Sequence, residues 1–318
     1  MNKKIGVKLV EANYPIFIVG APRSGTTFLQ LLLAASGKFT VVPETHYFSY
    51  IKPIIDHLSA RDEKIETLLK IIEGKPDIHL SDEQKSAFRI SLEKIELSDS
   101  AILAALIEAI SYNSQDHERW LEKTPKHIFH LNELWLAFPT AKVLNIVRDP
   151  RSVVSSFYYQ RSFRSKFSKW RYFFNRIDIW NRAVRSVGLN KDRLITIKYE
   201  SLVGNIDKEV GRAFSFVGLP CRDDYFLGFG KEYDLVVTSN ETHKLMSSSG
   251  QLTDRSDIWK ERISSFEVFV IERCCRDEMV RWGYEILTRP AGFTSIKVEG
   301  YVIFFRLVAL LSQIKKAF

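Results

Sequence analysis

The feature that most limits the fold is a short apolar run that leads through a glycine-containing loop into a leucine-rich segment. Residues 16–19 are all apolar and end at Gly20, which predicts a buried strand of a parallel sheet. Gly25 lies near the end of the following loop, and residues 28–33 predict a helix. This is the frame of a phosphate-binding loop, because exposed N–H groups and the helix dipole hold an anion there.

The loop departs from the pattern of nucleoside triphosphatases at one position. That pattern, GxxxxGK[ST], has a lysine after its second glycine, whereas this chain has Thr26 there and carries its cation earlier, as Arg23. In a triphosphatase that lysine, together with Mg²⁺, holds the β- and γ-phosphates. The loop therefore predicts an anion site that is not built for a triphosphate.

Further strands alternate with helices along the chain. Residues 142–147 predict a second strand, followed by Arg148 and by a helix with Pro150 in its first turn, and residues 194–198 predict a third strand. The predicted helices cover 62–73, 81–95, 100–113, 127–137, 168–187 and 263–282. This alternation predicts an α/β fold, with a P-loop-like parallel sheet flanked by helices.

The predicted elements form one continuous series without an obvious linker. We expect a single domain over residues 1–288, with a helical insertion at about 50–120. Residues 289–318 form a separate apolar tail that ends near Lys315 and Lys316, and this tail is too short and interrupted to span a bilayer. It predicts either peripheral contact with a membrane surface or packing on the domain or on a second subunit.

Composition excludes several classes of protein. The chain is 45% hydrophobic and 26% charged, as a globular domain is, and three cysteines are too few for a disulfide framework. With no apolar signal core and no spanning helix evident, we expect a cytoplasmic protein, with any membrane contact peripheral and at the inner face. The formal charge of +8 favours an anionic partner.

Much of that charge lies in one segment. Residues 161–176 hold six basic and no acidic side chains, with aromatic residues between them. Three interpretations stay open: the segment guides an acidic acceptor, it contacts anionic lipid, or it is the solvated face of a helix whose aromatics are core. The chain shows no recognised nucleic-acid module, so we expect no nucleic-acid partner.

Two motifs resemble a known family. The stretch PIFIVGAPRSGTTFLQLLL is similar to the 5′-phosphosulfate loop of sulfotransferases that use 3′-phosphoadenosine 5′-phosphosulfate (PAPS), and AKVLNIVRDPRSVVSSFYY is similar to their 3′-phosphate motif. In the second motif the family has an arginine at a strand end and a serine eight residues later, matched here by Arg148 and Ser156. The likeness covers roughly residues 14–284. It implies PAPS as the donor, 3′,5′-diphosphoadenosine as the product and no metal ion.

The resemblance also implies which residues bind the donor. Five loop residues are assigned to the 5′-phosphosulfate: Arg23, Ser24, Gly25, Thr26 and Thr27. Arg148 and Ser156 are assigned to the 3′-phosphate, Tyr199 to the adenine side, and Arg255 to a late 3′-phosphate loop. Fixed cations and N–H groups suit sulfuryl transfer, because negative charge builds up on the departing group.

The catalytic base follows from a comparison of two branches of that family. Cytosolic small-molecule sulfotransferases use a histidine two residues after a lysine, but here Pro125 occupies that place. The tyrosylprotein branch uses a glutamate in an E-T pair about twenty residues after the loop arginine, and a later lysine in a Lys-x-Pro context. Glu44 lies 21 residues after Arg23, and Lys123 fits the second feature. We predict Glu44 as the general base and Lys123, with Arg23, as a leaving-group cation; His46, His127 and His130 are the competing bases.

These observations predict sulfuryl transfer from PAPS to a hydroxyl acceptor by in-line displacement, with a glycan, glycolipid or small-molecule alcohol as the acceptor. One alternative is a P-loop kinase of a small molecule, in which Asp149 would bind Mg²⁺; before Pro150, however, Asp149 is more typical of a helix cap. The other alternative is a nucleotide-binding protein without catalysis.

Overall fold

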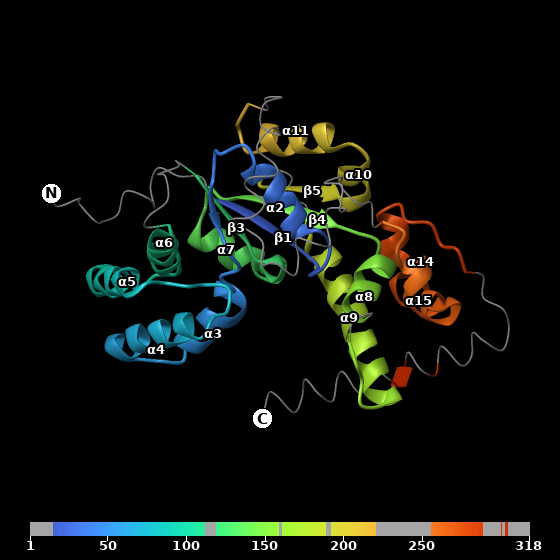
Figure 1. Cartoon of the computed structure of the whole chain (residues 1–318), viewed down its shortest axis with the longest axis horizontal. Coiled ribbons are helices and arrows are strands. Elements are labelled where there is room, and N and C mark those ends of the chain that lie inside the picture. The colour runs from blue at the N-terminus through green and yellow to red at the C-terminus, as the bar shows by residue number, and fades with distance from the viewer. Residues whose placement is uncertain are drawn as a thin grey trace.

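The structure is a computed structural model that describes residues 15–111, 119–158, 161–188, 192–220, 256–288, 300 and 303–304 (Figure 1). Within these residues, parallel strands form one sheet with the order β2-β3-β1-β4-β5. The strands are β1 (Ile16–Gly20), β2 (Thr40–Val42), β3 (Trp120–Lys123), β4 (Lys142–Val147) and β5 (Leu194–Lys198). The predicted α/β fold is confirmed.

Side chains alternate between the two faces of the sheet, and each face is covered by helices. Ile16 and Ile18 pack on one side with α2 (Thr26–Ala34) and α11 (Ile206–Phe216), whereas Phe17 contributes to the larger core on the other side. The helices of that other side are η2 (Pro125–His130), α7 (Leu131–Ala137), α8 (Pro150–Tyr158), α9 (Lys166–Ser186), α14 (Trp259–Arg262) and α15 (Ser265–Arg281). The short α10 (Tyr199–Gly204) follows β5 directly. Burial on both faces explains why β1, at the centre of the sheet, is continuously apolar.

A group of helices connects β2 with β3 and stands beside the sheet as a lobe (Figure 1). Its elements are the π-helix η1 (Tyr47–Ile51), α3 (Lys52–Ile55), α4 (Arg61–Glu73), α5 (Asp82–Lys94) and α6 (Asp99–Ile110). Helix α5 begins with a capping box, in which Ser81 and Gln84 each bond the other's backbone N–H. The helices predicted over 62–73 and 81–95 agree with the ends of α4 and α5 to within one or two residues.

Two strands were missing from the sequence prediction. Strand β2 has only three residues and ends before Pro43, so it offers too little pattern to identify. Strand β3 contains Glu122 and Lys123, and charged residues argue against a central buried strand, yet both side chains are buried. The predicted helix over 127–137 is instead a 3₁₀ segment, η2, followed by α7.

Strand β1 lies at the centre of the sheet, with β3 and β2 on one side of it and β4 and β5 on the other. Because all strands are parallel, their carboxyl ends meet at one edge, which is where ligands bind in open α/β sheets. The loops after β1, β2, β3, β4 and β5 therefore collect the predicted site residues at this edge.

Among the described helices, none is long and apolar enough to cross a membrane. Most of the tail over 289–318 and the predicted donor residue Arg255 lie outside the described residues. Ile303 and Phe304, which are described, have exposed side chains.

We expect Gly20→Ala to destabilise the fold by more than about 3 kcal/mol. Gly20 has φ 153°, and a Cβ there would lie 2.4 Å from the carbonyl oxygen of Ile146 on strand β4. Gly37 provides the matched control, because its φ is 61° but a Cβ would meet nothing within 4 Å. Gly37→Ala should cost only about 1 kcal/mol. Urea unfolding measures both, and equal losses would show that the β1–β4 contact is not tight.

Candidate active site

The loop between β1 and α2 is closed by its own hydrogen bonds. The Ser24 N–H and hydroxyl both donate to the carbonyl of Ala21, at 3.1 and 2.6 Å. Gly25, with φ 101°, is the N-cap of α2 and brings no side chain to the first N–H groups of that helix. Thr26 and Thr27 occupy the first turn of α2. The start of this nine-residue helix is thus arranged for an anion, whereas the donor contact predicted for Ser24 stays a prediction.

Arg23 joins the two sequence motifs. Its Nε donates a hydrogen bond of 3.1 Å to Oγ of Ser156 on α8, although the two residues are 133 positions apart. Arg23 and His46 are the non-glycine residues with positive φ among those described, at 75° and 53°. Such strained backbone is concentrated at functional sites, and both of these residues lie in loops at the carboxyl edge.

Arg148 lies at the end of β4 and is held from two sides. Its guanidinium stacks on the ring of Tyr199, 4.0 Å from the centroid, and Trp180 Nε1 donates to its carbonyl at 2.9 Å. The same ring packs against Gly25, where a Cβ would lie 2.5 Å from Tyr199 Cδ2. Tyr199 is buried, and its ring packs against both the loop at Gly25 and the Arg148 guanidinium.

Two cations meet at this point of the site. Burial lowers the pKa of Arg148, and the charge of Arg23 lowers it further. Neighbouring carboxylates, including Glu200, act in the opposite direction without restoring it. Two guanidiniums that repel each other beside a helix N-terminus are stabilised when an anion binds between or beside them.

Glu44 and Lys123 form a second group at the same edge. Lys123 Nζ donates to Glu44 Oε1 at 2.6 Å, and His46 Nε2 lies 3.2 Å from Glu44 Oε2. Burial acts to raise the pKa of Glu44, but the hydrogen bonds and charges of His46 and Lys123 outweigh it and lower the pKa to about 2. Glu44 is therefore ionised at neutral pH.

The group around Gly25 and the group formed by Glu44 and Lys123 lie at the ends of neighbouring strands. Lys123 on β3 pairs in register with Ile18 of β1, and β1 pairs on its other side with β4, which leads to Arg148. Neighbouring strands are about 4.8 Å apart, so one bound molecule can contact the loops that follow all three strands. The structure thus brings together Arg23, Arg148, Ser156 and Tyr199 around Gly25, with Lys123 on the adjacent strand β3 and Glu44 in the loop after β2.

A buried carboxylate that the sequence analysis missed fixes the second group. Glu122 is fully buried, and its Oε1 accepts from the Thr45 N–H, the Thr45 hydroxyl and the Thr124 hydroxyl at 3.3, 2.8 and 2.5 Å. Its Oε2 lies 3.2 Å from Nδ1 of His127, which is also fully buried. Thr124 Oγ1 in turn accepts from the N–H of His46 at 3.2 Å. Glu122 thereby ties the loop that carries Glu44 to the end of the strand that carries Lys123.

The same geometry separates the competing bases. His127 is fully buried against Glu122, where an acceptor hydroxyl cannot reach it. His130 Nδ1 lies 2.5 Å from Glu133. His46 is the histidine in contact with Glu44 among the described residues. Glu122 follows the apolar residues Trp120 and Leu121 and lies two residues before Thr124, which is the sequence signal that could have pointed to the buried network.

Asp149 has a structural role. Its Oδ1 accepts from the backbone N–H of Arg151 at 2.8 Å, and its carboxylate also binds the Arg151 guanidinium. Arg151 is further paired with Glu272 at 2.7 Å and stacks on Trp259. The helix-cap interpretation of Asp149 is confirmed, and its oxygens serve Arg151 rather than a magnesium site.

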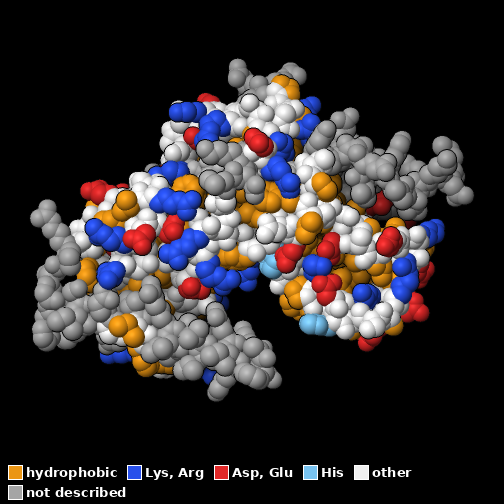
Figure 2. All heavy atoms as spheres, turned by 180° about the vertical axis from the view of Figure 1, so that it is seen from behind, with side chains coloured by type: hydrophobic (Ala, Val, Ile, Leu, Met, Phe, Trp, Pro, Cys, Tyr) orange, Lys and Arg blue, Asp and Glu red, His pale blue; other side chains and the backbone are white. Residues whose placement is uncertain are grey.

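The basic segment over 161–176 contributes aromatic side chains to the core. Phe173 is buried, and Arg176 stacks on Phe157 and Tyr172 with distances of 4.6 and 4.4 Å. Figure 2 shows Lys and Arg side chains along the hollow between the lobe of α4 to α6 and the rest of the molecule. The helix-face interpretation fits the aromatics, whereas contacts of this segment with an acidic acceptor or with lipid stay predictions.

The chain is similar in sequence to known proteins. Residues 15–224 match the model of the sulfotransferase family. A protein-tyrosine sulfotransferase of Drosophila melanogaster is 26% identical over 219 residues, which are 65% of this chain and 38% of the relative. Protein-tyrosine sulfotransferase 1 of Danio rerio is 26% identical over 213 residues, which are 65% of this chain and 54% of the relative. The chain thus spans about half or less of the length of these relatives.

Solved structures share the fold. The sulfotransferase domain of the Synechococcus PCC 7002 olefin synthase superposes with a TM-score of 0.56 at 19% identity, over 86% of this chain and 96% of that domain. The sulfotransferase domain of the curacin biosynthetic pathway gives a TM-score of 0.56 at 20% identity, over 86% and 98%.

We expect Glu122→Gln to lower the free energy of unfolding by about 2–3 kcal/mol at pH 7, because the amide lacks the negative charge that strengthens the threonine bonds and the contact with His127. Burial raises the pKa of Glu122, but His127 and the threonines outweigh it and hold the pKa below the ordinary value of 4.5. The stabilisation is therefore present above about pH 4.5 and is lost as the pH falls through the folded pKa. The difference between wild type and variant should shrink in that range.

A matched control is Glu133→Gln, which removes the carboxylate of a half-exposed glutamate–histidine pair on the surface. It should change stability by less than about 1 kcal/mol. Chemical denaturation between pH 3 and 8 measures both variants. A Glu122→Gln effect no larger than that of the control would show that the buried network does not hold the site.

Proposed function

Because the chain belongs to the sulfotransferase family, we propose that it transfers a sulfuryl group from PAPS to a hydroxyl acceptor. The observation that carries the proposal is the meeting of Arg23 and Arg148 at a glycine loop that has no triphosphate lysine. A donor with one anionic group at its 5′ end and another at its 3′ position fits two separate guanidiniums, one from each motif.

The residues present fit this donor. Gly25 makes room for the ring of Tyr199, which lies where a Cβ would be, and brings no side chain to the start of α2. Arg23 and the N–H groups of Gly25, Thr26 and Thr27 would hold the 5′-phosphosulfate. Arg148, supported by the ring of Tyr199, would hold the 3′-phosphate through its planar fork, with Ser156 beside it.

When bound, PAPS supplies the sulfuryl group and leaves as 3′,5′-diphosphoadenosine. The chain's own residues supply the proton acceptor and the positive charge. Glu44 accepts the hydroxyl proton on its carboxylate, and Lys123 Nζ provides a cation for the departing phosphate. In the structure Lys123 Nζ is bound to Glu44 Oε1, which holds the pKa of Glu44 at about 2. A carboxylate with so low a pKa is a weak base, and it becomes stronger once the lysine charge is directed elsewhere.

The acceptor is proposed as a hydroxyl compound. The relatives in Drosophila and Danio are named for protein tyrosine, which carries a phenolic hydroxyl. Among acceptors we favour a glycan, glycolipid or small-molecule alcohol. The kinase alternative is weakened by Asp149, whose oxygens bind Arg151, and by the absence of lysine after Gly25 in the sequence.

We expect the protein to bind 3′,5′-diphosphoadenosine tightly without Mg²⁺ and to bind ATP negligibly. Arg148→Lys should weaken binding of the diphosphate by about 10- to 100-fold, because the planar bidentate contact is lost. The variant should leave binding of 5′-AMP, which lacks the 3′-phosphate, nearly unchanged. Isothermal titration with both ligands makes the comparison. Equal losses for the two would contradict the 3′-phosphate assignment, and tight Mg²⁺-dependent ATP binding would favour a kinase.

We expect Glu44→Gln to reduce turnover by about 10²-fold or more, since the amide cannot accept the hydroxyl proton. Binding of 3′,5′-diphosphoadenosine should change little. The measurement is transfer of label from ³⁵S-PAPS to lipid, glycan and phenol fractions, which also identifies the acceptor.

His46→Ala is the control for this assignment, because His46 contacts the same carboxylate. It should retain most of the activity. A Glu44→Gln variant near the wild-type rate, together with an inactive His46→Ala, would move the role of base to His46. Binding of the nucleotide without turnover in every fraction would favour the non-catalytic alternative.

A further inference from the structure

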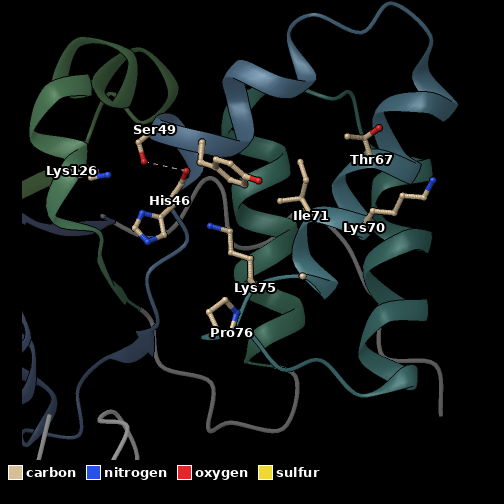
Figure 3. A pocket seen from close by; sticks show the side chains of 10 residues that line it. His46, Ser49, Thr67, Lys70, Ile71, Lys75, Pro76 and Lys126 are labelled. Atoms are coloured by element: carbon tan, nitrogen blue, oxygen red, sulfur yellow. Dashed lines mark hydrogen bonds between the residues drawn. The ribbon is translucent and has the colours of Figure 1, made fainter. Parts of the chain in front are cut away.

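A pocket of about 590 Å³ opens beside the proposed base (Figure 3). Its walls come from the segment around η1, from the end of α4 and the residues after it, and from η2. His46, whose ring contacts Glu44, forms part of the wall. Through His46, the wall of the pocket is in direct contact with the Glu44 carboxylate. The volume is in the range of small-molecule sites rather than of extended peptide grooves.

The pocket is positively charged. Lys70, Lys75 and Lys126 line it together with His46, and none of the described lining residues is acidic. Figure 3 shows Lys75 extending toward His46, with Lys126 on the other side of that ring and Lys70 at the far rim. Lys75 and Lys126 are therefore the cations that lie toward the base.

Several cations elsewhere in the lobe are paired with carboxylates. Lys52 is paired with Asp56 and Asp99, and Arg89 is paired with Glu66. Among the described residues, by contrast, no carboxylate lies within ion-pair distance of the three pocket lysines. Among the described residues, the pocket thus gathers three lysines that lack a carboxylate partner around one cavity.

Lys75 is the lysine most affected by this setting. It is partly buried, and its ammonium lies 5.1 Å from the centroid of the Tyr50 ring. Burial lowers its pKa, although Asp77, Glu44 and Glu122 act to raise it. A partly desolvated ammonium gains more from a bound anion than an exposed one does. Tyr50, Ile71 and Pro76 add an apolar wall to the same pocket.

We propose that this pocket binds the acceptor, and that the acceptor is a small alcohol with an anionic group, a carboxylate or a phosphate, which contacts Lys75 and Lys126. Its ring or stem lies against Tyr50 and Ile71, and its hydroxyl faces Glu44. This inference rests on the proposed function, because it assigns the substrate class to the same catalytic site.

The test uses matched acceptors that differ only in charge or phosphorylation. p-Nitrophenyl β-D-glucuronide is compared with p-nitrophenyl β-D-glucoside, and glucose 6-phosphate with glucose. Binding is measured by saturation-transfer NMR with 3′,5′-diphosphoadenosine present, and turnover is measured with ³⁵S-PAPS. We expect at least one anionic member to bind about 10-fold or more tightly than its neutral partner. The pair that shows the preference distinguishes carboxylate from phosphate.

Lys75→Met should reduce that preference to less than about threefold and should act mainly on the acceptor KM. Lys94→Met is the control, because Lys94 is an exposed lysine of α5 in the same lobe that does not line the pocket. It should leave the preference unchanged. Binding of 3′,5′-diphosphoadenosine should be equal in all three proteins, which shows that they are folded.

The outcomes separate this inference from the proposed function. Failure of both anionic compounds to bind better than their neutral partners overturns the inference, whether or not sulfated product forms. An aspartate-flanked tyrosine peptide that binds in preference to both small acids also overturns it and favours a peptide acceptor. A clear anion preference in binding, abolished by Lys75→Met, supports it. Absence of turnover with every acceptor would count against the proposed function alone.

Discussion

The site depends on the parallel pairing of β1 with β3 on one side and with β4 on the other. This pairing places three strand ends side by side, and each carries a different part of the chemistry: the anion loop after β1, Lys123 at the end of β3 and Arg148 after β4. The absence of a side chain at Gly20 permits this pairing, because a Cβ there would lie 2.4 Å from the carbonyl oxygen of Ile146. Because the strands are parallel, functional groups far apart in the chain meet at one edge.

Arg148 and Arg151 lie three residues apart but have different neighbours, and this difference separates a structural arginine from one that is proposed to bind the donor. Arg151 is enclosed by Asp149, Glu272 and Trp259, so its charge is balanced within the fold and secures α8 against α14 and α15. Arg148 instead stacks on Tyr199. Burial and the charge of Arg23 oppose the ionised form of Arg148, although the charges of Glu200 and Asp149 favour it. The first arrangement stabilises the folded protein without a ligand, whereas the second becomes favourable when an anion binds.

The sequence was sufficient for features that are encoded locally. The strand, loop and helix around Gly25, and the strand end at Arg148, each lie within about twenty residues, so their patterns predicted the fold and the anion loop. Glu44 and Lys123 could be proposed only through a family resemblance, because nothing in their local sequence marks a base. Glu122 was missed, since its bonds to Thr45 and Thr124 exist only once two short strands pair. The lysine pocket likewise needs α4 and η1 folded together.

The ion pair between Glu44 and Lys123 links the two halves of the proposed reaction. With a pKa of about 2, Glu44 holds its negative charge firmly, and its affinity for a proton is low while Lys123 and His46 contact it. In the proposed reaction a bound donor attracts Lys123, so the carboxylate gains basicity when the donor is present. Lys75 lies close enough for its charge to interact with that of Glu44. In the proposed reaction an acceptor anion bound to Lys75 would screen this interaction, so the charges of Lys123 and Lys75 link the donor and the acceptor to the base.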